Sequence, residues 1–419
     1  MILFRTAHIE RGTIMRAYER LLNYVVVRTP SDENSTTFPS SDCQFNLAKL
    51  LVEEMKELGI EDARVDEHCY VYGTIPATPG YEDKTKIGFI AHMDTVSDYC
   101  DHDITPVLHE NYDGGDLVLG TSGRSLTVKD FPHLPELAGR TLITTDGTTV
   151  LGADDKAGIA EILTMVERIK EENIPHGTIC IAFTPDEEIG TGTEHFDVEA
   201  FGAEYGYTLD GDTEGEIQFE NFNACKADFE ITGFGVHPGS SKDTMINACL
   251  VAAEINNMLP GCETPRGTED YEGFYHLVSM SGDVTKAELH YLVRDHDKTF
   301  FEARKNTLRL IAKDLNEKWG EGTIKLTISD QYKNMAEIIA TCMHLIDNAK
   351  KACENANVAP QVMAIRGGTD GCQLSFKGLP CPNLGTGGHA YHGPYEHITV
   401  EGMDKSVDVI IELVKLYAE

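Results

Sequence analysis

Apolar and polar residues follow two different patterns along the chain, and the change between them falls near residue 223. Before it, short apolar runs such as 86–91 and 178–183 alternate with segments such as 47–58 and 157–169, whose apolar residues recur on one helical face. The short runs are typical of buried strands and the longer segments of amphipathic helices. Strands that alternate with helices predict a largely parallel sheet that is covered on both faces.

A second pattern begins at Cys225, where apolar and polar side chains alternate as far as Thr232. This alternation predicts a half-buried strand. The segments that follow are predicted to be helix, strand, strand, helix and strand, at about 244–258, 274–280, 287–294, 298–319 and 323–328. The order β-α-β-β-α-β predicts a ferredoxin-like unit inserted in the larger domain.

After about residue 332 the chain returns to helices and apolar strands. We therefore expect an α/β protein with a discontinuous larger domain, residues 15–222 and 332–419, and an inserted domain, residues 223–331. Residues 1–14 are predicted to be an N-terminal extension, with the first helix starting at Met15. Ser41 and Gln44 have the spacing of a capping box for the next helix.

Composition narrows the classes of partner. The formal net charge of −34 argues against nucleic acid and anionic membranes as partners. The eleven cysteines include no CxxC pair, which favours reduced thiols and hence a cytoplasmic location over a disulfide framework. No apolar run approaches the length of a membrane span.

Candidate chemistry starts with the adjacent acids Glu187 and Glu188, which follow the apolar run 178–183. Adjacent acids at the end of a strand repel each other, so a cation normally has to compensate them. Other potential metal ligands also lie at predicted strand or loop ends: His92, Asp94, Asp154, Asp210 and His392. Together these residues predict a hydrolase with two metal ions.

Such an enzyme needs two cations about 3.5–4 Å apart, a carboxylate shared between them, and a water molecule whose pKa they lower. Asp154 is the natural shared ligand because small residues flank it just before a helix. Glu187 is left without a metal beside the ligand Glu188 and can act as the general base. Asp94 lies two positions from His92 on an extended segment and can orient its imidazole. Imidazole and carboxylate ligands suit two Zn²⁺ ions, with Co²⁺ or Mn²⁺ possible.

Each motif has an ordinary alternative when it is taken alone. A His-x-Asp pair is usually a surface turn, paired glutamates are usually a charged helix face, and Asp154-Asp155 would most often cap a helix. Asp101-His102-Asp103 illustrates the ordinary case, and we interpret it as a solvated loop. The metal interpretation is favoured because the five candidate ligands occur in a fixed succession at strand or loop ends of one α/β pattern. These ligands are His92, Asp154, Glu188, Asp210 and His392.

The succession of motifs resembles the M20 metallopeptidase family, from about Met15 to the C-terminus. The phrases that carry the resemblance are His92-x-Asp94, Gly152-Ala153-Asp154-Asp155-Lys156, Asp186-Glu187-Glu188, Arg366-Gly367-Gly368-Thr369-Asp370-Gly371 and His392. The resemblance implies that His92 and Asp210 hold one metal, that Glu188 and His392 hold the other, and that Asp154 bridges them. It also implies a cis peptide bond between Asp154 and Asp155.

The same resemblance assigns a function to the inserted domain, as a lid through which two chains form a homodimer. His237 would reach the active site of the partner subunit and stabilise the oxyanion, although a buried structural histidine is the alternative. Arg294, Arg366 and Thr369 are candidates to bind the substrate, although either arginine could be an ordinary surface residue. The segment around the last ligand, His392, departs from the family at His389-Ala390 before it and at Pro394-Tyr395 after it. These positions bear on the preference for substrate side chains, and His389 becomes a competitor in ligand assignment.

The function that the resemblance implies is a metallo-aminopeptidase, which releases the N-terminal residue from tripeptides by attack of a metal-bridging hydroxide. Two alternatives stay open at this point. One is another M20 amidohydrolase with the same metal ligands, such as a dipeptidase, a carboxypeptidase or a deacylase. The other is a non-catalytic relative, which the presence of every ligand and of the base disfavours.

Overall fold

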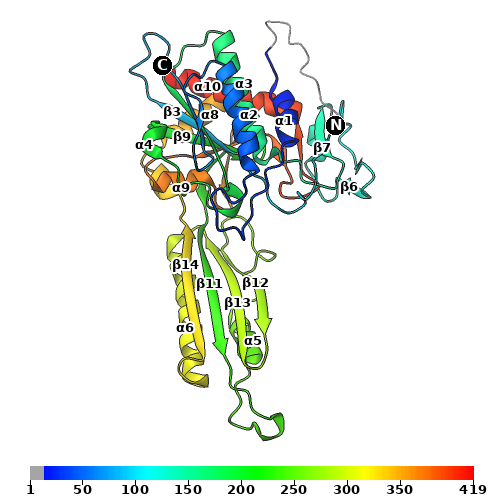
Figure 1. Ribbon diagram of the computed structural model, residues 1–419, viewed down its shortest axis with the longest axis vertical. Coiled ribbons are helices and arrows are strands. Elements are labelled where there is room, and N and C mark those ends of the chain that lie inside the picture. Colours follow the sequence, from blue (N-terminus) through cyan, green and yellow to red (C-terminus); the bar gives the residue numbers. More distant parts are fainter. Residues whose placement is uncertain (1–13) are drawn as a thin grey trace. The chain divides into compact units, whose positions relative to one another are not determined.

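The computed structural model describes residues 14–419 and divides the chain into two compact units (Figure 1). The first unit contains the residues up to Phe219 together with Ile338–Met363 and Thr369–Glu419, and the second contains Glu220–Glu337 and Ala364–Gly368. The predicted N-terminal extension lies outside the described residues, apart from Ile14. The first helix, α1, spans Ala17–Val25, close to the expected start.

The first unit is built on an eight-stranded mixed sheet. Its four central strands, β8, β3, β9 and β16, run parallel to one another, and the pairs β1–β2, β2–β8 and β16–β10 are antiparallel. The strands in spatial order are β1 (Arg64–Val65), β2 (Val71–Ile75), β8 (Ile179–Thr184), β3 (Ile87–His92), β9 (Tyr205–Gly211), β16 (Asn383–Gly385), β10 (Glu216–Asn221) and β15 (Gln361–Ile365). The predicted α/β class with a mostly parallel central sheet is therefore confirmed.

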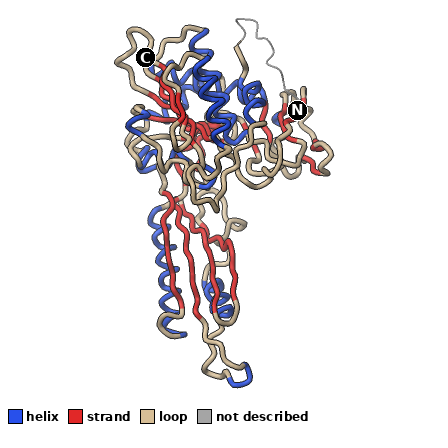
Figure 2. Tube along the Cα trace, in the orientation of Figure 1, coloured by secondary structure: helices blue, strands red, loops and turns tan. Residues whose placement is uncertain are grey.

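Helices cover both faces of this sheet, as Figure 2 shows for the upper part of the molecule. On one face, the Phe89 ring stacks against Tyr207, whose hydroxyl donates to the Leu345 carbonyl. The neighbouring side chain on the strand, Ile90, packs in a separate cluster with Phe201, since successive residues of a strand point to opposite faces. Besides α1, the helices of this unit are α2 (Gln44–Glu57), α3 (Ala153–Glu171), α4 (Val198–Phe201), α8 (His344–Asn355), α9 (Asp370–Phe376) and α10 (Val400–Ala418). The short helix α7 (Ala336–Ile339) lies where the chain passes from the second unit back to the first.

Smaller elements complete the first unit. A four-stranded sheet has the order β17 (Gly388–His389), β18 (His397–Thr399), β7 (Leu142–Thr145) and β4 (Pro106–His109), and a hairpin joins β5 (Leu117–Leu119) to β6 (Arg124–Leu126). The expected capping box at Ser41 is wrong, because α2 begins at Gln44 and its N-cap residue Cys43 makes no side-chain capping bond. Gln44 instead donates a hydrogen bond to Asp186, so tertiary contacts use the side chain that the local pattern assigned to a cap.

The second unit has the predicted order β-α-β-β-α-β. Its elements are β11 (Asn223–Thr232), α5 (Ala248–Met258), β12 (Phe274–Gly282), β13 (Lys286–Asp295), α6 (Lys298–Trp319) and β14 (Ile324–Tyr332). The sheet is antiparallel with the spatial order β12-β13-β11-β14, and the inward side chains of β11 share one buried core with α5 and α6. This is the ferredoxin-like arrangement that the order of the six predicted elements indicated.

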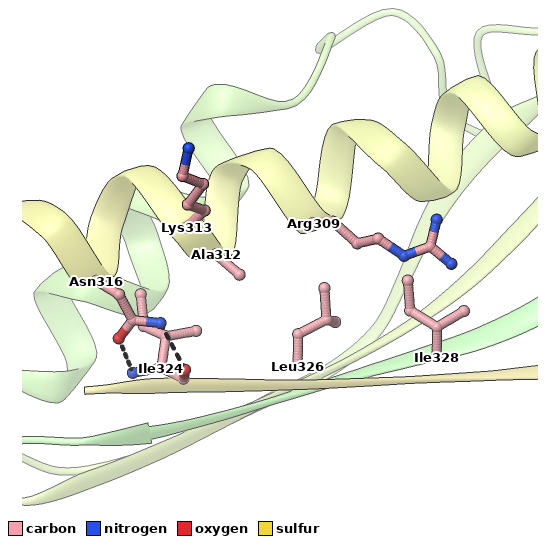
Figure 3. Close-up of a pocket in the computed structure, with 7 residues that line it drawn as sticks. All are labelled: Arg309, Ala312, Lys313, Asn316, Ile324, Leu326 and Ile328. Atoms are coloured by element: carbon pink, nitrogen blue, oxygen red, sulfur yellow. Dashed lines mark hydrogen bonds between the residues drawn. The ribbon is translucent and has the colours of Figure 1, made fainter. Parts of the chain in front are cut away.

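A pocket of about 390 Å³ opens between α6 and β14 (Figure 3). Its wall of Ala312, Leu326 and Ile328 is apolar, and Arg309 and Lys313 lie along the helix beside it. The Asn316 side chain bonds both the N–H and the C=O of Ile324, at 2.8 Å each, and thereby ties the helix to the edge strand. The described lining of this pocket includes no imidazole, thiol or carboxylate, so the pocket offers no ligand of the predicted kind for a metal ion.

Candidate metal centre

Three neighbouring strands of the first unit carry predicted ligands to one edge of the sheet. His92 is the last residue of β3, Asp210 is the penultimate residue of β9, and Glu188 lies in a short 3-10 helix just after β8. These three strands are adjacent and parallel, and the carboxyl ends of parallel strands meet at the same edge, where ligands of α/β sheets usually bind. The topology thus explains why residues so distant in sequence converge.

Asp154 lies between the two predicted histidine ligands. Its Oδ1 atom is 3.0 Å from Nε2 of His92, and its Oδ2 atom is 2.9 Å from Nε2 of His392. Each carboxylate oxygen therefore faces a different imidazole. This is the arrangement that a carboxylate shared by two cations requires.

The remaining two predicted ligands are each close to a different imidazole. Asp210 Oδ1 is 3.5 Å from Nε2 of His92, and Glu188 Oε2 is 3.1 Å from Nε2 of His392. The five predicted ligands thus form two sets that have Asp154 in common. Within the described residues, two groups have ligand atoms that all lie within 4.8 Å of one another, namely His92 with Asp155 and Asp210, and His92 with Asp154 and Glu188.

The backbone around Asp154 departs from the helix that follows. Gly152 has a left-handed φ of 73°, and Asp154 and Asp155 have non-helical dihedral angles at the start of α3. The peptide bond between Asp154 and Asp155 is cis, as the family resemblance implied. Asp154 therefore lies where the backbone is not yet helical, before the regular turns of α3.

The electrostatics of the cluster fit bound cations. Burial and then the neighbouring Asp154 raise the pKa of Glu188 to about 7, and burial raises the pKa of Asp210 to about 6. Hydrogen bonds to Asp154 and Glu188 raise the pKa of His392 to about 11. Buried carboxylates in contact are costly unless positive charge compensates them. A donor set of imidazole nitrogen and carboxylate oxygen is the one that zinc and similar divalent ions prefer.

Glu187, the predicted base, lies beside this cluster and is partly buried. Burial and then the negative charge of Asp210 raise its pKa well above the ordinary value for a glutamate. A general base works best when its pKa lies close to the working pH, and carboxylates reach that range only in such surroundings. Its surroundings are therefore those of a proton-transferring group.

Asp94 has more contacts than the sequence suggested. Its Oδ1 accepts a hydrogen bond from the Glu187 N–H at 3.0 Å, and its Oδ2 accepts one from the Glu188 N–H at 3.2 Å. The Oδ1 atom is also 3.4 Å from Nδ1 of His92. Asp94 is fully buried, so one carboxylate holds the imidazole of a candidate ligand and the backbone of the paired glutamates together.

Glu396 is a residue of the site that the motif analysis did not assign. Its Oε2 accepts hydrogen bonds from the N–H groups of Leu151 and Gly152, at 2.6 and 2.9 Å, and its Oε1 accepts one from the N–H of Asp154 at 3.0 Å. One buried side chain thereby fixes the backbone that carries the shared carboxylate. Its hydrogen bonds join positions that are 242–245 residues apart, which no local motif could indicate.

Two further aspartates hydrogen-bond to backbone groups near the ligands, and one of them, Asp155, also belongs to a group of close ligand atoms with His92 and Asp210. Asp155 accepts hydrogen bonds from the N–H groups of His92 and Gly158, at 3.1 and 3.2 Å. Asp186 accepts from the N–H and hydroxyl of Ser40 and from the Gln44 amide. Both carboxylates therefore position backbone next to the ligands, and sequence reasoning gave neither of them this role.

His389 does not join the ligands. Its ring stacks on His133 with centroids 4.2 Å apart, and His133 in turn makes a 2.9 Å Nε2–Nε2 hydrogen bond with His397. Burial lowers the pKa of His389 to about 3, so it is neutral and packed. The ligand set nearest to Asp154 therefore contains His392 and not His389. The Asp101-His102-Asp103 loop is exposed, as expected.

The other predicted site residues lie mostly in the second unit. His237 is exposed in the loop after β11, which contradicts the alternative of a buried structural histidine, and its Nδ1 accepts a hydrogen bond from the Gly239 N–H. The Arg366 guanidinium donates to Thr268, Asp270 and Glu272.

Arg294 is buried over the Tyr332 ring, and its described hydrogen bonds come from Nη1 alone. Both terminal nitrogens of Arg366 are thus engaged, whereas Arg294 is held back from a substrate by its burial. Thr369, in the first unit, has a buried hydroxyl without a hydrogen-bond partner among the described residues.

Comparisons with known proteins identify the family of the chain. Residues 152–416 match the model of peptidase family M20/M25/M40. The chain belongs to this family. It is 51% identical to the Peptidase T of Clostridium perfringens over 405 residues, which cover 96% of this chain and 99% of that protein. This relative confirms the resemblance to the M20 family along nearly the whole chain.

Solved structures show the same fold at lower identity. The aminopeptidase PepT of Bacillus cereus superposes with a TM-score of 0.76 at 24% identity, covering 96% of this chain and 98% of that one. A tripeptidase of Staphylococcus aureus superposes with a TM-score of 0.77 at 22% identity, covering 97% and 99%. The expected fold is therefore confirmed along nearly the whole chain.

The sequence also predicted reduced cysteines and no membrane-spanning segment. All eleven cysteines are free, as the absence of a CxxC pair suggested. None of the helices within residues 14–419 combines the length and the apolar character that crossing a membrane requires.

Proposed function

We propose that the protein is a metal-dependent aminopeptidase that releases the N-terminal residue from tripeptides. The observation that carries the proposal is the position of Asp154, whose two oxygens face His92 and His392 at 3.0 and 2.9 Å. The curated relatives named Peptidase T and the tripeptidase structure support the substrate class. Two Zn²⁺ ions are the proposed cofactors, with Co²⁺ or Mn²⁺ as alternatives.

Each residue has a proposed task. His92 and Asp210 would hold one ion, Glu188 and His392 the other, and Asp154 would be shared. When bound, the ions would lower the pKa of a water molecule and polarise the carbonyl of the first peptide bond. Glu187 would take the proton from that water and return it to the leaving amine. Asp94 would keep His92 and the backbone of Glu187 in register through the contacts described above.

Removal of metal provides the direct test of this function. The protein as purified is expected to cleave Ala-Ala-Ala at its first peptide bond, to lose that activity with a chelator, and to regain it with Zn²⁺. Product analysis by mass spectrometry and metal analysis of the same sample would be the measurements. Preferential cleavage of Ala-Ala or of N-acyl amino acids would instead indicate a dipeptidase or a deacylase of the same family. No cleavage of any of these by the metal-loaded protein would contradict an enzymatic role.

We also propose the remaining roles that the family resemblance implies. The inserted domain, residues 223–331, would be a lid through which the protein forms a homodimer, and the larger domain, residues 15–222 and 332–419, would be catalytic. Arg294, Arg366 and Thr369 would bind the substrate. A cytoplasmic location accords with the free cysteines.

His237 would complete the active site of the partner subunit by stabilising the oxyanion. Its exposed position after β11, held by the turn at Pro238 and Gly239, supports this proposal. The His237→Ala variant is expected to lose about 10²–10³-fold in kcat. Mixing it with Glu187→Gln under conditions of subunit exchange should restore part of the activity, since one site of a mixed dimer then has both groups. Full exchange without any recovery would show that His237 does not act across subunits.

A further inference from the structure

Asp212 is an acidic residue beside the candidate metal centre that none of the roles above uses. It lies two positions after the candidate ligand Asp210, just beyond the end of β9. Its backbone is held at both polar atoms, because its N–H donates to Glu216 Oε2 at 3.0 Å and its carbonyl accepts from the N–H groups of Gly387 and Gly388, at 2.7 and 3.1 Å. The main chain of Asp212 is therefore fixed.

The same contacts bring Asp212 to the segment that carries His392. Gly387 and Gly388 precede that ligand by a few residues, and the hydroxyl of Tyr391, next to it, donates to the Gly211 carbonyl at 3.2 Å. Asp212 thus follows the candidate ligand Asp210 in sequence, and its backbone is hydrogen-bonded to the segment that precedes the candidate ligand His392.

The carboxylate of Asp212 is not engaged. The residue is exposed to solvent, and its side chain makes no hydrogen bond or ion pair within residues 14–419. The surrounding protein and then the negative charge of Asp154 raise the pKa of Asp212, whereas His392 lowers it. The candidate ligands Asp154 and His392 are therefore close enough to Asp212 to interact with it electrostatically. A free anionic group on a fixed backbone, next to carboxylates that metal would occupy, is suited to bind a cation of the substrate.

An aminopeptidase substrate has one such cation at its cleaved end. The α-amino group of a peptide has a pKa of about 7.7–8.0 and is an ammonium at neutral pH. We propose that Asp212 binds the α-ammonium group of the peptide and so selects substrates with a free N-terminus. This inference rests on the proposed aminopeptidase function and adds a residue that determines specificity. Its rival is direct binding of the neutral amine by the metal ions.

The two modes of binding differ in the sign of their pH dependence. If Asp212 binds the ammonium, the KM for Ala-Ala-Ala rises as the pH passes about 8, because the substrate loses its charge. If the metal ions bind the neutral amine, the KM falls over the same range. The Asp212→Asn variant is expected to have a kcat/KM at pH 7 that is lower by about tenfold or more, since hydrogen bonds between charged groups are the strong ones. In this variant the KM should also rise much less above about pH 8 than it does in the wild type.

A binding measurement separates recognition from turnover. In the cleavage-deficient Glu187→Gln background, calorimetry would compare Ala-Ala-Ala with propanoyl-Ala-Ala, which lacks only the amino group. Adding Asp212→Asn should weaken the binding of Ala-Ala-Ala by about tenfold and leave that of propanoyl-Ala-Ala unchanged. Asp103→Asn, which removes an equally exposed charge from a loop that we assign no role, is the matched control.

Several results would overturn the inference. Equal weakening of both ligands, no weakening of either, or loss of metal from the Asp212→Asn protein would each show that the residue does not recognise the ammonium. Asp212→Ser serves as a second variant should the first fold poorly. Failure of the wild type to cleave Ala-Ala-Ala would refute the proposed function itself, whereas cleavage with an unchanged pH profile in the Asp212 variants would refute only this inference.

Discussion

Replacing Glu187 with glutamine is expected to lower turnover by about 10²–10⁴-fold, the usual contribution of a general acid–base group, while metal remains bound. Glutamine keeps the size of the side chain but cannot accept the proton. The backbone of residue 187 stays in place, because Asp94 holds its N–H and that of Glu188. The ligands of both proposed metal sites are unchanged in this variant. Steady-state kinetics and metal analysis of the same preparation would measure the two effects.

The matched control for this variant is Glu194→Gln. Glu194 is exposed a few residues further along the same segment, so its replacement makes the same change in charge without touching the site. Its turnover should equal that of the wild type. Near-normal activity of Glu187→Gln would remove Glu187 from its role. Loss of metal together with activity would instead make Glu187 a ligand and not a base.

The parts of the site that sequence could predict are those with a local signal. The apolar run 178–183 ends at the glutamate pair, and the run 86–91 ends at His92. Once both runs are placed as parallel strands, their carboxyl ends must meet, and the structure shows β3 and β8 paired in that way. In the second unit, the alternation from Cys225 to Thr232 was enough to predict β11, because one face of this strand is buried and the other is exposed.

The parts that sequence could not predict depend on contacts between distant segments. Glu396 holds the N–H of Leu151 across 245 residues of chain, and no periodicity or spacing near either residue records that contact. The capping box at Ser41 failed for the same reason, since Gln44 has a stronger partner in Asp186, 142 residues away. The second role of Asp94 was also hidden, because backbone N–H groups exist at every position and leave no mark in a sequence.

Removing the Asp154 carboxylate should weaken both proposed metal sites at once. Its two oxygens face different imidazoles, so Asp154→Ala takes a ligand from each set. Glu188→Ala and His392→Ala each take a ligand from the same single set and should mainly empty that site. Metal content after dialysis, and affinity measured against a competing chelator, would distinguish one lost ion from two.

The size of the effect can be judged against a variant that leaves every ligand in place. Glu396→Gln disturbs only the residue that holds the backbone of Asp154, and loss of such an outer partner typically costs about 10–100-fold in metal affinity. Asp154→Ala should exceed that cost at both sites, because it removes a direct ligand of each. If Asp154→Ala kept both ions with unchanged affinity, the carboxylate would not be shared. The 3.0 and 2.9 Å contacts would then be ion pairs within the protein and nothing more.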